Sequence, residues 1–125
     1  MKKAREEMTV AMKDEGLGLE VLAEEFGDMR VGLFTLPAGF DLAPIFAPMP
    51  DGRCPVRHWG RVLEGELHLR YADGTEEVTR AGEFFHWPAG HIGRTEETGV
   101  VWIDVCPVTE ARHVDETLAA AAADA

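Results

Sequence analysis

Hydrophobic and polar residues alternate with a period of two through most of the middle of the chain. Runs of β-branched and aromatic residues, bounded by glycine, proline and acidic turn residues, are typical of short strands. We expect strands at residues 29–36, 56–63, 66–72, 76–80, 83–88 and 100–105. Asp73-Gly74 predicts a hairpin and Glu64-Gly65 a second turn, because glycine adopts positive φ without strain. The pattern therefore predicts an antiparallel, β-dominated domain of the sandwich or barrel type.

The two ends of the chain depart from this pattern. Residues 1–28 are highly charged, and their apolar residues at positions 4, 8, 11 and 12 have roughly helical spacing, so we expect a partly helical N-terminal segment. Residues 108–125 are rich in alanine and predict a C-terminal helix and tail. The β domain would then span residues 29–107. Within it, prolines at 44, 48, 50 and 55 remove backbone donors, which indicates an edge strand or a loop.

Length and charge limit the function classes. A chain of 125 residues has room for one domain. Its 12 basic and 23 acidic residues give a net charge of −11, which repels phosphates and anionic lipids, so we expect neither a nucleic-acid partner nor a membrane. Apolar runs of signal-peptide or membrane-spanning length are missing, which predicts a cytoplasmic protein. Two distant cysteines do not form a disulfide framework, and we expect them to be reduced.

One pair of residues suggests metal chemistry. Cys54 lies four residues before His58, on the loop that leads into a predicted strand. A thiolate and an imidazole in this relation can bind one cation. The alternative is a small buried thiol beside a histidine that merely packs, which is the commoner arrangement.

A second cluster lies in the sequence FFHWPAGH. Pro88 and Gly90 turn the chain sharply after an aromatic strand and leave His91 on the turn. His86 precedes this corner and is a candidate fourth ligand or hydrogen-bond donor to a ligand, with packing in the strand as the alternative. Either histidine could meet Cys54 and His58 if the two strand ends border one cavity.

The segments HWGRVLEGELHLRYADG (58–74) and AGEFFHWPAGH (81–91) resemble the two sequence motifs of the cupin superfamily. Cupins are small β-barrels of the jelly-roll type, in which a His-x-His pair, a glutamate and a histidine of the second motif bind a metal inside the barrel. The resemblance covers about residues 30–106. It implies an all-β, cupin-type jelly-roll barrel.

The residues of this sequence depart from the usual cupin pattern. With Gly65 on the closing glycine of the first motif, His58 falls on the usual glutamate and Cys54 on the second histidine. In the second motif Gly93 stands at the usual histidine, and His91 lies two residues earlier. The pattern resembles small bacterial cupin-domain proteins in which a C-x-x-x-H-W-G segment and a P-x-G-H corner recur. That resemblance implies a relocated ligand set.

With this fold, Cys54, His58 and His91 would converge on one barrel mouth, with His86 as the candidate fourth ligand. One thiolate and two imidazoles suit Zn²⁺, with Fe²⁺ or Ni²⁺ as alternatives, and three protein ligands leave a position for water or substrate. The hypotheses are a small metal-dependent enzyme acting on a small molecule, a non-catalytic metal- or ligand-binding sensor or accessory module, and a barrel filled by its own side chains. The resemblance also implies a homodimer, in contact through the proline-rich segment or Trp59.

Overall fold

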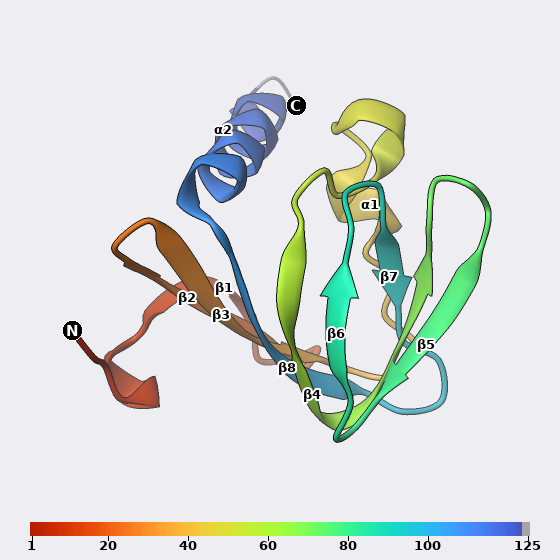
Figure 1. Cartoon of the computed structure of the whole chain (residues 1–125), viewed down its shortest axis with the longest axis horizontal. Coiled ribbons are helices and arrows are strands. Elements are labelled where there is room, and N and C mark those ends of the chain that lie inside the picture. The colour runs from red at the N-terminus through yellow and green to blue at the C-terminus, as the bar shows by residue number, and fades with distance from the viewer. Residues whose placement is uncertain (124–125) are drawn as a thin grey trace.

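The computed structural model describes residues 1–123 and shows a curved antiparallel sheet with a helix on one face (Figure 1). The strands are β1 (Thr9–Asp14), β2 (Leu19–Phe26), β3 (Met29–Leu36), β4 (His58–Arg70), β5 (Glu76–Arg80), β6 (Phe84–Trp87), β7 (Ile92–Arg94) and β8 (Val100–Pro107). The helices are α1 (Ala43–Phe46) and α2 (Val108–Ala123), with single 3₁₀ turns at Arg5–Glu7 and Pro50–Gly52. Hydrogen bonding joins the strands in the order β1-β2-β3-β8-β4-β5, and β6 and β7 also pair with β4.

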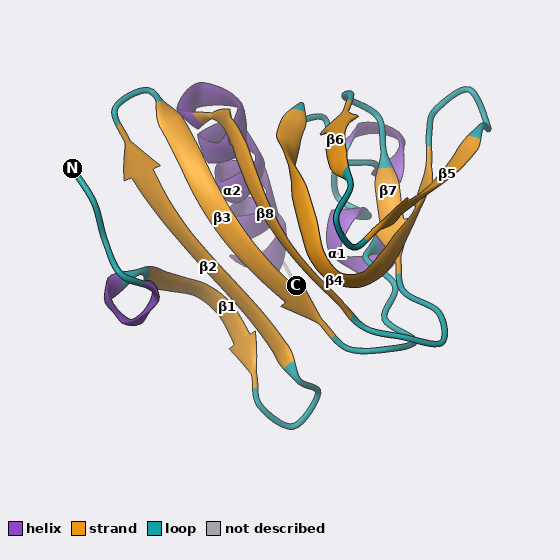
Figure 2. Cartoon of the chain, turned by 60° about the horizontal axis from the view of Figure 1, so that its bottom comes forward, coloured by secondary structure: helices purple, strands orange, loops and turns teal. Residues whose placement is uncertain are grey.

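The all-β prediction is confirmed, and strand structure forms at every stretch expected between residues 29 and 105, but the stretches 56–63 and 66–72 belong to one strand. The sheet is not a closed barrel, because none of the pairings found within residues 1–123 joins β1 to β5. Figure 2 shows β1, β2, β3 and β8 as one continuous layer, with β5 and β7 folded over on the far side of β4. The interior therefore lies between two walls of a partly rolled sheet.

Strand β4 connects the two walls, and the turn predicted at Glu64-Gly65 was wrong. The chain continues through these residues as one strand of 13 residues. Its first part pairs with β6 and β8, and its last part pairs with β5 and β7. The register against β8 shifts between Val62 and Glu64, and Gly65 has a φ of 70°. A bulge bends a strand and increases its twist, so β4 crosses from one wall to the other instead of reversing.

The helix predicted from the spacing of residues 4–12 was also wrong. Within residues 1–28 the helical structure is limited to the turn Arg5–Glu7, and β1 and β2 form a hairpin that pairs with β3. The side chains of β1 are all exposed, so no apolar face of a helix would have been buried there. Backbone hydrogen bonding to the edge of the sheet outweighs the weak helical pattern, as tertiary context often does.

The core lies between the two walls, and α2 covers its open side. The largest fully buried side chains are Val62, Leu67, Leu69 and Trp87. Phe84 of β6 lies on the outside and is 80% exposed, so it does not fill the interior. Ion pairs hold α2 in place, from Arg30 to Asp115, from Arg57 to Glu110 and from Arg112 to Glu25.

The expected C-terminal helix is confirmed as α2, while residues 124–125 of the predicted tail lie outside the described residues. Among the described helices, none is long and apolar enough to cross a membrane.

Candidate metal centre

Two loops that lie far apart in the sequence are joined at the top of the cavity. The proline-rich segment between β3 and β4 forms α1 and a loop, as its proline content predicts. Cys54 then forms an isolated antiparallel bridge with His91. The Cys54 N–H donates to the His91 carbonyl at 2.9 Å, and the Gly90 N–H donates to the Cys54 carbonyl at 2.8 Å. These two bonds place the thiol and the imidazole at the same cavity.

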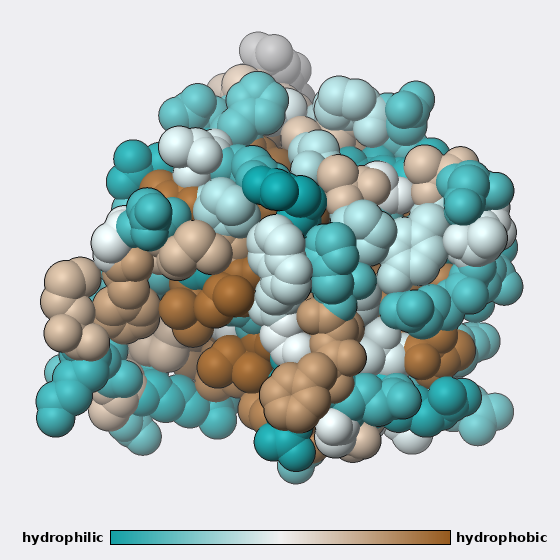
Figure 3. Space-filling model, viewed as in Figure 1, coloured by the Kyte–Doolittle hydropathy of each residue, from teal (hydrophilic) through white to brown (hydrophobic). Residues whose placement is uncertain are grey.

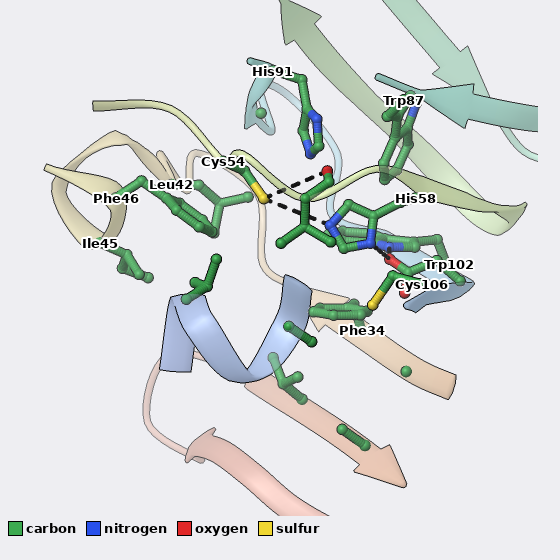
Figure 4. Close-up of a pocket in the computed structure, with 18 of the residues that line it drawn as sticks. Phe34, Leu42, Ile45, Phe46, Cys54, His58, Trp87, His91, Trp102 and Cys106 are labelled. Carbon is green, nitrogen blue, oxygen red and sulfur yellow. Dashed lines mark hydrogen bonds and ion pairs between the residues drawn. The ribbon is translucent and has the colours of Figure 1, made fainter. Parts of the chain in front are cut away.

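The third member of the group comes from the start of β4. His58 points into the interior, and its Nε2 lies 3.6 Å from the Cys54 Sγ (Figure 4). One ligand atom from each of Cys54, His58 and His91 can be chosen so that all three lie within 4.8 Å of one another. Ligand atoms of a tetrahedral zinc site, at about 2.0 to 2.3 Å from the ion, are separated by roughly 3.5 Å. The three donors therefore fit a single divalent cation with small side-chain adjustments.

Hydrogen bonds select the ring nitrogens that face the group. The Nδ1 of His91 lies 2.7 Å from the Pro88 carbonyl oxygen, which can only accept, so we assign the proton of His91 to Nδ1. This leaves its Nε2 free to ligate. A histidine that donates its other N–H to a carbonyl is the usual arrangement around protein metals, because it sets the tautomer and the ring orientation.

A buried carboxylate supports His58 from behind. Asp104 is 3% exposed, and its Oδ2 accepts a hydrogen bond from the Trp102 Nε1 at 2.8 Å. The same oxygen lies 3.4 Å from the His58 Nδ1, within ion-pair distance, although that nitrogen makes no aligned hydrogen bond. Asp104 thus favours a proton on Nδ1 and directs Nε2 toward Cys54.

Asp104 was not among the predicted site residues, although the sequence contains a signal for it. In β8 the buried positions are 100, 102, 104 and 106, and the residues between them are more exposed. A carboxylate in an otherwise apolar alternation marks a buried charge that needs a partner. Cys106, on the same face, is free and buried and also borders the cavity.

Electrostatic interactions favour a protonated His58 and an ionised Cys54 thiolate in the metal-free protein. Burial lowers the pKa of His58, but the charge of Asp104 and polar contacts with Asp104, Cys106 and Cys54 together raise it well above its ordinary value. Burial raises the pKa of the Cys54 thiol, but hydrogen bonds and positive charge from His58 and His91 together lower it to about 6. A thiolate is the form of cysteine that binds metals.

We expect a corresponding titration in the metal-free protein. Because the pKa of Cys54 is about 6, its thiol should be protonated below that pH and ionised above it. The ultraviolet absorbance of the thiolate should therefore rise with a midpoint near pH 6, and Cys54→Ser should remove this step. A midpoint near the ordinary cysteine value of about 8.5 would contradict the described geometry.

His86 does not join the group. It lies on the face of β6 opposite to the buried Trp87 and is exposed. Its ring stacks on Trp59 with a centroid separation of 4.8 Å. The structure therefore brings together Cys54, His58 and His91 and leaves the candidate fourth ligand outside.

Comparison with solved structures identifies the fold. An RmlC-like cupin from Shewanella frigidimarina NCIMB 400 is similar with a TM-score of 0.57 and 23% identity, over 84% of this chain and 87% of that one. The Fe(II) form of HppE is similar with a TM-score of 0.60 and 12% identity, over 85% of this chain and 59% of that one. A DMSP lyase structure gives a TM-score of 0.59 and 10% identity, over 80% of this chain and 56% of that one.

No family model and no curated protein matches the sequence. The chain has the cupin fold, a half-open jelly roll in this case, with a cysteine and two histidines grouped in its interior.

Proposed function

We propose that this protein binds one divalent metal ion through Cys54, His58 and His91. With this ion it would be a small metal-dependent enzyme that acts on a small molecule. The observation that carries the proposal is the convergence of three ligand atoms, within 4.8 Å of one another, from two loops and a strand. The group lies at the wall of a cavity, so one side of a bound ion would face the space where a substrate can enter. The similar structures of an Fe(II) protein and of a lyase support the proposal.

The donor set favours zinc. A thiolate and two imidazoles suit a borderline-soft ion, and Fe²⁺ and Ni²⁺ are the alternatives. A bound zinc ion would supply Lewis-acid chemistry, which polarises a substrate oxygen or lowers the pKa of a water. The residues of this chain orient the ligands: Asp104 holds the His58 ring, and the Pro88 carbonyl holds the His91 ring. Both cysteines are free thiols, which suits the predicted cytoplasmic location.

The second candidate function is a non-catalytic metal or ligand sensor. One observation favours it. Near the three ligands, the further titratable groups that line the cavity are Asp104 and Cys106, and Asp104 is already in contact with Trp102 and His58. Asp104 is therefore not free to transfer a proton to or from a substrate. The two functions differ in whether the metal has an exchangeable position. Azide added to the Co²⁺-substituted protein should change its visible spectrum if the protein is an enzyme. An unchanged spectrum would favour the sensor.

Metal analysis of protein produced without a histidine tag tests the metal binding that both candidate functions require. We expect about one zinc per chain after reconstitution, and a sulfur-to-metal charge-transfer band in the Co²⁺ form. His86→Ala is the matched control, because it removes a histidine that lies outside the group, and it should bind the same amount. Negligible metal in the wild-type protein, or equal loss in His86→Ala, would contradict the proposal.

Asp104→Asn should weaken metal binding without removing a ligand. The amide keeps the shape of the side chain but lacks the negative charge beside the His58 Nδ1. Loss of such a supporting partner typically lowers metal affinity about 10- to 100-fold. Competition with a chromophoric chelator measures this change, and an affinity equal to wild type would show that Asp104 has no part in the site.

We also infer a homodimer, formed through the outer face of the sheet. Exposed apolar side chains from three adjacent strands gather there: Trp59, Leu63, Phe84 and Ile103. Figure 3 shows brown, hydrophobic side chains on this face at the position of β3 and β8. Arg57 and Arg61 lie over aromatic rings of the same face, which limits repulsion between two acidic chains.

Light scattering should give twice the chain mass of 13.7 kDa for the wild-type protein. Phe84→Glu should give monomers, because it places a charge on the most exposed apolar side chain of that face. Leu17→Glu, which makes the same kind of change in the β1–β2 turn, should remain dimeric. Monomeric wild-type protein at micromolar concentration would refute the inference.

A further inference from the structure

The cavity beside the metal group has a distinctive lining. Its volume is about 220 Å³, and most of its wall is aliphatic or aromatic. Trp102 forms one aromatic wall, stacked on Phe34 with a centroid separation of 4.6 Å and meeting Trp87 edge-on at 5.4 Å. Figure 4 shows these rings on one side of the space, with Leu42 and Phe46 of the α1 region opposite them. The polar side chains gather at the end formed by Cys54, His58 and His91.

Lysine and arginine are almost missing from this lining. Among the lining residues, all of which belong to the described part of the chain, Arg30 is the single arginine or lysine. Its Nη1 donates to the Asp115 Oδ2 at 2.7 Å, so its charge is already paired. Asp104, in contrast, brings a buried carboxylate to the metal end of the cavity.

We propose that the cavity binds a small neutral molecule: an apolar body of about one ring, carrying a single hydroxyl or carbonyl oxygen directed at the Cys54, His58 and His91 group. The oxygen contact rests on the proposed metal site, whereas the apolar contact does not. The size follows from the volume, because an apolar cavity of about 150 Å³ already accommodates benzene. A space of 220 Å³ accepts one ring and a short substituent. The aromatic wall favours an aromatic body, which can pack edge-to-face or offset against it.

The charges of the site select a neutral ligand. A bound divalent ion would be balanced by the Cys54 thiolate and the Asp104 carboxylate, which leaves no surplus positive charge for an anion. An anionic ligand would lose its hydration without gaining an ion-pair partner, and this is costly in an apolar cavity. A sugar or polyol would leave several hydroxyls unpaired against the apolar wall, which excludes that class for the same reason.

The opening of the cavity lies between β1 and α2. Met12 of β1 and Asp115 of α2 border the cavity and are exposed, whereas His91 and Asp104 at the metal end are buried. A ligand therefore enters past the side chains of α2. Ala111 of α2 is buried and lines this passage, so a larger residue there would narrow it.

The three tryptophans allow a direct test by NMR. Trp87 and Trp102 line the cavity, and Trp59 lies on the outer face of the sheet as an internal control. Benzyl alcohol and benzoate, which share a ring but differ in charge, would be titrated into the full chain while the indole N–H resonances are recorded. We expect saturable shifts of Trp87 and Trp102 with benzyl alcohol, an unchanged Trp59, and at least about tenfold weaker binding of benzoate.

Variants on α2 test whether the ligand binds in the cavity, and the metal state separates the apolar contact from the oxygen contact. Ala111→Leu should weaken benzyl alcohol binding, while Ala119→Leu, the same change at an exposed position of α2, should not. Thermal melting of both variants shows whether each is folded. Binding to the metal-free protein tests the apolar contact alone, and tighter binding after zinc loading tests the oxygen contact.

The result that overturns the inference is benzoate binding as tightly as benzyl alcohol, or no saturable shift in either metal state. Failure of the proposed function has a different signature, since it would appear as missing metal in the stoichiometry measurement while benzyl alcohol still bound the metal-free protein.

Discussion

Cys54→Ser should lower the zinc affinity of this protein by more than about 100-fold, beyond the range expected for losing an outer partner of a ligand. The thiolate is the one anionic donor of the group, and its Sγ lies 3.6 Å from the His58 Nε2, where a shared ion would join them. A serine hydroxyl remains protonated at neutral pH and is a poor ligand for zinc. Chelator competition measures the affinity.

Cys106→Ser is the matched control for this prediction. Cys106 is also a free, buried thiol at the same cavity, but it is not a member of the three-residue group. The same substitution there should leave zinc affinity within a few-fold of wild type. If Cys106→Ser lost as much affinity as Cys54→Ser, the assignment of the ligands would be wrong. If neither variant lost affinity, the metal site itself would be refuted.

Gly65→Ala should produce the largest loss of stability, about 3 kcal/mol or more. Gly65 follows the bulge of β4 with a φ of 70°, and a Cβ there would overlap the carbonyl group of Gly99. The substitution therefore combines an unfavourable backbone conformation with a clash against backbone atoms, which cannot move aside as a flexible side chain would. Urea unfolding gives the change in free energy.

Gly74→Ala separates the cost of the backbone conformation from the cost of the clash. Gly74 also has a positive φ, of 87°, but a Cβ there would meet no atom within 4 Å. Its cost should be limited to the backbone term of about 1 to 2 kcal/mol. Equal losses in the two variants would show that the contact with Gly99 does not constrain β4.

Local patterns predicted most of the strands correctly. Residues 29–36 and 76–80 have the alternation of half-buried strands, and β3 and β5 occupy these same residues. Asp73-Gly74 predicted the β4–β5 hairpin for a local reason, because Gly74 adopts the positive φ and the Asp73 carboxylate accepts a hydrogen bond from the Thr75 N–H. Such features depend on neighbouring residues and can be read from the sequence.

Other features depend on partners that are distant in the chain. Thr9–Asp14 forms a strand because β2 offers it an edge to pair with, and its spacing alone suggested a helix. Gly65 indicated a turn by its residue type, but the continued pairing of β4 with β8 and β5 keeps it inside one strand, next to a bulge. His86 had the right residue type for a ligand, and only the direction of its side chain on β6 places it outside the group.

The sequence by itself determined the class of fold, through alternating hydrophobicity and turn residues, and named the thiol and the two imidazoles. The tertiary structure decided which of the candidate ligands meet, because the bridge between Cys54 and His91 joins segments 37 residues apart. It also revealed Asp104 behind His58 and the apolar cavity beside them. Burial, tautomer and charge at this site arise from contacts between loops and strands, and no single segment of the chain contains them.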